Sequence, residues 1–61
     1  MGMNTFYESG TGRPISLSAS AVKAFHPDPD NEELVTIELV NGSKYTVKAD
    51  MNSVRKWVEA G

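Results

Sequence analysis

The sequence contains no cysteine and only one histidine, His26. The absence of cysteine excludes a disulfide framework, a thiolate metal site and a thiol nucleophile. A single histidine and the lack of nucleophile-elbow spacing leave no serine with a base to activate it. No apolar run approaches the roughly 20 residues that a membrane-spanning helix requires, and no signal-peptide core is present. We therefore expect a cytoplasmic protein that does not associate with a membrane.

The sequence also lacks a dominant charge. The formal net charge is −2, and residues of both signs are spread along the chain. This distribution argues against a dedicated nucleic-acid binder or a polybasic membrane anchor. The 61 residues allow one domain with a small core. Such a chain is marginally stable unless it packs well or forms an oligomer, because it can bury little apolar surface. A homodimer that shares a sheet face or edge would bury more.

The clearest local pattern lies in residues 34–48, where two β-rich runs flank an Asn-Gly pair, a strong hairpin signal. A two-residue turn would place Tyr45 opposite Glu38 and split the large apolar side chains between two faces. A three-residue turn ending at a left-handed Gly42, with a G1 bulge, instead places Tyr45 opposite Ile37. We predict this bulged register, which gathers on one face Val35, Ile37, Leu39, Tyr45 and Val47.

Two further strands are predicted before the hairpin. Alternating apolar and serine residues predict a strand over 14–18. The alternation fails after it, so we place a bend near 18–21 and a second strand over 22–26, with a bulge near 23–24. A helix over 18–25 is the competing interpretation.

Residues 1–12 show no sustained periodicity and are predicted to form a flexible tail. Phe6 and Tyr7 are the exception within this segment. They leave open a second interpretation, in which an extended segment docks on the sheet or on a partner.

Residues 26–33 contain two prolines and a concentration of acidic side chains, which predicts a solvated loop. Counted from Asp28, an EF-hand would need glycine at Glu33 and glutamate at Leu39, so the calcium-loop pattern fails. His26 is interpreted as a half-exposed residue at a strand end.

The C-terminal residues predict a helix over 51–60. Asp50 is a suitable N-cap, and the apolar residues recur at helical spacing on one side. This stripe, which should cover the apolar face of the sheet, consists of Met51, Val54, Trp57 and Val58.

No pattern of residues predicts catalysis, and we assign no catalytic, cofactor-binding or metal-binding residue. A sheet with one helix leaves one face uncovered, and such a face or an open edge favours binding of a protein partner or of a second copy. The candidate partner-binding surface consists of Leu34, Thr36, Val40, Thr46 and Arg55. Basic side chains could also gather on one side and meet phosphates; these are Lys23, Lys44, Lys48, Arg55 and Lys56.

The spacing of apolar residues around the Asn-Gly turn resembles that of the small flagellar FlbD-type proteins. The residues that carry this resemblance are Leu17, Val22, Phe25, Val35, Ile37, Leu39, Asn41, Gly42, Tyr45, Val47, Lys48 and Val54. The same run is similar to the start of LytTR-type DNA-binding domains. The first resemblance implies no reaction. The second would imply DNA binding, but the basic recognition segment of that family has no counterpart here. No site residue is transferred from either family.

The sequence thus predicts an α+β domain over 13–61, with an antiparallel sheet of three or four strands and a C-terminal helix on one face. The strands are expected at approximately 14–18, 22–26, 34–40 and 43–48. The predicted function is a non-catalytic interaction or regulatory module that binds a protein partner or itself, without a cofactor. The alternative is a nucleic-acid-binding accessory domain.

Overall fold

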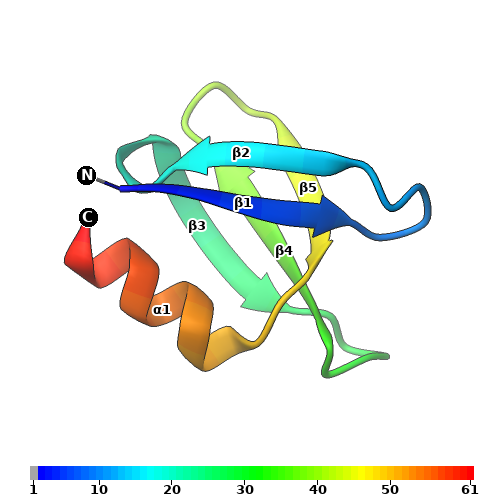
Figure 1. Ribbon diagram of the computed structural model, residues 1–61. Helices are drawn as coiled ribbons and strands as arrows, with labels where there is room; N and C mark the ends of the chain where they lie inside the picture. Colours follow the sequence, from blue (N-terminus) through cyan, green and yellow to red (C-terminus); the bar gives the residue numbers. More distant parts are fainter. Residues whose placement is uncertain (1) are drawn as a thin grey trace.

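A computed structural model describes residues 2–61 and shows a curved antiparallel sheet with one helix (Figure 1). The strands run in the order β2-β1-β5-β4-β3. In chain order the elements are β1 (Met3–Glu8), β2 (Pro14–Ser18), the 3-10 turn η1 (Ala19–Ala21), β3 (Val22–Pro27), β4 (Leu34–Leu39), β5 (Lys44–Lys48) and α1 (Met51–Ala60). The predicted α+β class, antiparallel sheet and C-terminal helix are confirmed. The sheet has five strands, not three or four.

The additional strand comes from the segment predicted as a flexible tail. Residues 3–8 form β1, which lies between β2 and β5 in the sheet. Phe6 on this strand is only 7% exposed and joins the core. The prediction of a tail is therefore wrong for these residues, and the docked extended segment is the interpretation that the structure supports. Met1, the first residue of the predicted tail, lies outside the described residues.

The β4–β5 hairpin has the predicted bulged register. Ile37 is opposite Tyr45 and Val35 is opposite Val47. The Leu39 N–H donates to the Ser43 carbonyl at 2.8 Å, and Gly42 has a φ of +93°. A left-handed backbone at this position favours glycine, because other residues meet a steric penalty there.

The connection between β2 and β3 is short and bent. Only residues 19–21 form a helical turn, so the competing helix over 18–25 is wrong. The register of β3 against β4 shifts between Val22 and Ala24, which confirms the predicted bulge. Strand β3 runs to Pro27, so it includes the first residues of the predicted acidic loop.

Helix α1 begins at an N-cap. The Asp50 carboxylate accepts the Ser53 N–H at 3.2 Å, which satisfies one of the free donors at the start of the helix. Val54 is fully buried, and Met51, Trp57 and Val58 pack partly buried against the core. The predicted apolar stripe therefore covers the inner side of the sheet.

The N-terminal end of β1 is fixed to α1 through Trp57. The indole N–H donates to the Gly2 carbonyl at 2.5 Å, and the indole ring meets Phe6 edge-on with centroids 5.0 Å apart. Gly2 is also very close to η1, since a Cβ on it would lie 2.8 Å from that of Ala19. Gly2 and Gly61 consequently lie near each other, since a Cβ on Gly61 would be 3.4 Å from the Gly2 Cα, and the start of β1 lies beside the end of α1 (Figure 1).

Candidate functional site

Helix α1 packs on the inner side of the sheet and leaves its outer face uncovered. Side chains of directly opposite residues point to the same side of a sheet. The pairing of Tyr7 with Lys48 and of Lys48 with Leu34 therefore makes one row across β1, β5 and β4. The next row joins Thr46, Thr36 and His26. These residues define the outer-face patch: Tyr7, His26, Leu34, Thr36, Thr46 and Lys48.

Three of the five predicted surface residues lie together in this patch. Leu34, Thr36 and Thr46 are half-buried neighbours, and the hydroxyls of Thr36 and Thr46 are 3.1 Å apart. One of these hydroxyls donates a hydrogen bond to the other. The centre of the patch therefore combines an apolar leucine with two threonines whose hydroxyls are bonded to each other.

The other two predicted residues lie elsewhere. Val40 is at the tip of the β4–β5 hairpin and is 67% exposed. Arg55 is on α1, where its guanidinium is 3.4 Å from the Asn52 side-chain oxygen. Because α1 packs on the inner side of the sheet, Arg55 does not belong to the outer-face patch.

The sequence analysis singles out Tyr7 with Phe6 but does not include Tyr7, the largest exposed side chain of the patch, in the candidate partner-binding surface. Tyr7 is 55% exposed and pairs with Pro14 on one side and Lys48 on the other. It was left out because residues 1–12 were assigned to a tail. Glycines within residues 9–13, between a β-rich run and the 14–18 strand, were an available signal for a hairpin.

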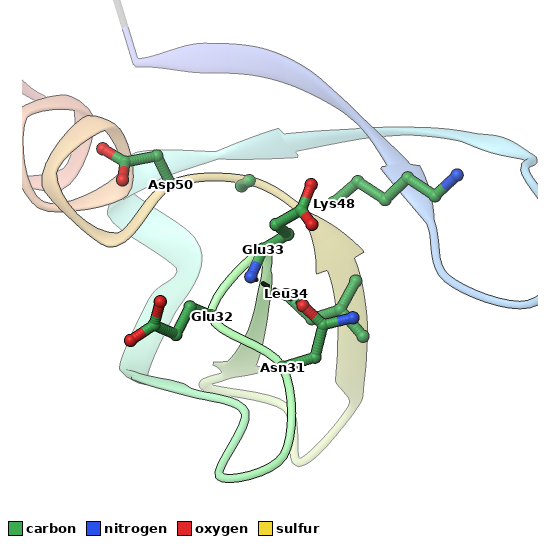
Figure 2. Close-up of a pocket in the computed structure, with 7 residues that line it drawn as sticks. Asn31, Glu32, Glu33, Leu34, Lys48 and Asp50 are labelled. Atoms are coloured by element: carbon green, nitrogen blue, oxygen red, sulfur yellow. Dashed lines mark hydrogen bonds between the residues drawn. The ribbon is translucent and has the colours of Figure 1, made fainter.

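A depression lies beside the acidic loop and borders the outer-face patch at Leu34 and Lys48. It has a volume of about 580 Å³ and is lined by residues 31–34 and 48–50. Figure 2 shows the carboxylates of Glu32, Glu33 and Asp50 around it. Two hydrogen bonds within the loop hold its backbone. The Asp28 carboxylate accepts the Asp30 N–H, and the Asn31 side-chain oxygen accepts the Glu33 N–H. Within residues 2–61, no three His, Asp or Glu side chains are grouped closely enough to hold a metal ion.

The basic residues do not form one surface. Lys44 and Lys48 lie on the outer side of β5, whereas Arg55 and Lys56 lie on α1. Lys23 is 3.9 Å from the Glu38 carboxylate. No helix in the described part of the chain is long and apolar enough to cross a membrane.

The fold and surface define a small α+β domain with an exposed sheet face. Comparison with protein-family models, with curated proteins and with solved structures gives no match. The resemblance to FlbD-type and LytTR-type proteins therefore stays a prediction.

Proposed function

We propose that the protein is a non-catalytic interaction module that binds a protein partner through the outer-face patch. The observation that carries this proposal is the row of Tyr7, Lys48 and Leu34 across three strands on the face opposite α1. Exposed aromatic side chains are enriched at protein interfaces, and they supply much of the binding free energy. Tyr7 offers an apolar ring and a hydroxyl that can donate and accept hydrogen bonds.

The chemistry of the patch favours a protein over a nucleic acid. Lys48 is the only cation among the residues of the patch, and Leu34, Thr36 and Thr46 surround it with apolar and hydroxyl groups. Binding of nucleic acid depends on several cations that release counterions from phosphates. We expect no binding of duplex or single-stranded DNA at low salt, and a steep salt-dependent affinity would favour the alternative function.

Photo-cross-linking in the cells that produce the protein tests this proposal. A benzophenone side chain replaces Tyr7 in one sample and the exposed helix residue Asn52 in the control, and mass spectrometry identifies the adducts. We expect a defined protein adduct from position 7 and none from position 52. Adducts with nucleic acid, or equal adducts from both positions, would contradict the proposal.

The identified partner then allows a quantitative test with purified proteins. Loss of a central aromatic at an interface commonly costs about 2 kcal/mol or more, so Tyr7→Ala should weaken binding at least about tenfold. Met3→Ala is the matched control, because Met3 lies on the same strand, faces the same side and is 64% exposed. Equal affinities for the two variants would place the contact away from the outer-face patch.

A further inference from the structure

Strand β2 lies at the edge of the sheet, and some of its backbone groups point away from β1, its one partner strand among residues 2–61. In this ladder the Glu8 N–H donates to the Arg13 carbonyl and the Ala19 N–H donates to the Gly2 carbonyl, both at 2.8 Å. Hydrogen-bonded and non-bonded pairs alternate in an antiparallel ladder. The odd-numbered residues of β2 therefore bond to β1, while Ser16 and Ser18 direct their N–H and C=O groups to the open edge. No strand of residues 2–61 pairs there.

The opposite edge of the sheet is protected in ways that β2 is not. Strand β3 contains a bulge, ends at Pro27 and continues into the acidic loop. Bulges, prolines and nearby charges discourage the addition of another strand. Strand β2 has no charged residue and no register shift, and its single proline, Pro14, stands at its start.

We propose that a second copy of the chain pairs with this edge, β2 against β2, antiparallel and with the two-fold axis at Ser16. This inference deepens the proposed function by naming one partner, but it uses a different surface from the outer-face patch. Each interface can therefore fail without the other. The result would be one sheet that runs continuously through both copies.

The register centred on Ser16 is self-complementary over the whole strand. Each Ser16 N–H meets the Ser16 carbonyl of the other copy, and each Ser18 N–H meets the Pro14 carbonyl. Pro14 has no N–H, so every donor that the edge presents finds an acceptor. A two-fold contact of this kind uses the same residues from both subunits and closes as a dimer.

Side-chain chemistry in this register also favours a second copy. Ile15, which is half-buried, falls opposite Leu17 of the other copy on the core side. Arg13 falls opposite the small Ala19, so no like charges are juxtaposed along the contact. Like charges directly opposite in a sheet destabilise it, and their absence allows two identical strands to approach.

Charge-swap variants at Ser16 test this dimer in the full chain. Ser16 is exposed, its N–H makes no bond to β1, and its hydroxyl shares one exposed hydrogen bond with Thr5 at 3.0 Å, so Ser16→Glu and Ser16→Lys should keep the fold. Each variant alone brings like charges together at the axis. We expect sedimentation equilibrium to show a dissociation constant at least about tenfold above that of the unmodified protein.

An equimolar mixture of the two variants places opposite charges at the axis and should restore a heterodimer. Asn52→Glu and Asn52→Lys, on the exposed side of α1, are the matched controls and should dimerise like the unmodified protein. Circular dichroism establishes that each variant is folded. An unmodified chain that is monomeric near 1 mM would overturn the proposal. So would Ser16 variants that still dimerise alone, or a mixture that stays monomeric.

Discussion

The β3–β4–β5 part of the sheet and the β1–β2 hairpin reach similar structures from very different sequences. In β4 the burial alternates along the strand, with Val35 and Ile37 fully buried and their neighbours half-exposed. Strand β1 has one buried residue, Phe6, while Glu8 is half-buried and the other four residues are exposed. Yet β1 lies inside the sheet and β3 lies at its edge.

The difference separates local from long-range determinants of the fold. The β4–β5 register follows from the Asn-Gly turn and from apolar alternation, which act within one hairpin. The position of β1 depends on partners far along the chain, because Phe6 meets Trp57 and Gly2 accepts the indole N–H. A strand held by one buried aromatic and its backbone bonds has almost no periodic pattern of its own.

The largest effect is expected from removing the aromatic ring that holds β1. Truncation of a buried phenylalanine costs about 3–5 kcal/mol, so Phe6→Ala should lower the free energy of unfolding by that amount or unfold the domain. Tyr7→Ala, at the exposed neighbour, should cost less than about 1 kcal/mol. Urea unfolding followed by circular dichroism measures both.

If the Phe6→Ala variant does not fold, Phe6→Leu provides a folded variant whose free energy of unfolding can be compared with that of Tyr7→Ala. This change keeps most of the apolar volume and should cost less than about 1.5 kcal/mol. If alanine at positions 6 and 7 had the same small effect, β1 would contribute no more to stability than a disordered tail.

The next largest effect on stability is expected at the β4–β5 turn, where the local determinants of the register can be tested. Gly42 has a left-handed backbone, which costs a residue with a side chain about 1–2 kcal/mol and a β-branched residue more. Gly42→Val should therefore lower the melting temperature clearly. Asn41→Ala loses only the bond from the Ser43 N–H to the Asn41 side chain, worth about 1 kcal/mol. Equal shifts in the two variants would be incompatible with the bulged turn.

The sequence was sufficient for the parts of the fold in which turn chemistry and periodicity agree. The β4–β5 register, the bulge near Ala24 and the helix after Asp50 are all confirmed. The fifth strand lacks this agreement: Gly10 and Gly12 signal a turn before residues 14–18, but residues 3–8 show no apolar alternation, and tertiary contacts decide where they pair.

The candidate site also contains residues that local patterns could predict and residues that depend on long-range contacts. Leu34, Thr36 and Thr46 were grouped correctly because they share strand parity within one hairpin. Arg55 was misplaced because it lies on α1, and α1 packs on the inner side of the sheet, away from the outer face. Tyr7 was left out of the candidate surface because residues 1–12 are predicted to form a tail. The open edge of β2 could be identified only from the strand order, which places β2 at the end of the sheet formed by the described residues, next to β1.

The smallest effect concerns the ion pair made by Glu38. Strand pairing places Lys44 opposite Glu38, but the ion pair joins Glu38 to Lys23 at the β3 bulge, at 3.9 Å. The Lys23 side chain is 64% exposed and that of Glu38 is 25% exposed. Such pairs contribute about 0.2–1 kcal/mol, and salt screens them.

Double-mutant cycles with Glu38→Gln can show which lysine is coupled to Glu38. We expect a coupling free energy within that range for Lys23→Ala at low salt, and a smaller one for Lys44→Ala. We expect the stronger coupling for Lys23 because the β3 bulge inserts this residue between Val22 and Ala24, next to Glu38. A larger coupling free energy between Glu38 and Lys44 than between Glu38 and Lys23 would contradict this prediction. It would show that Glu38 interacts mainly with its partner on β5 and not with the β3 bulge.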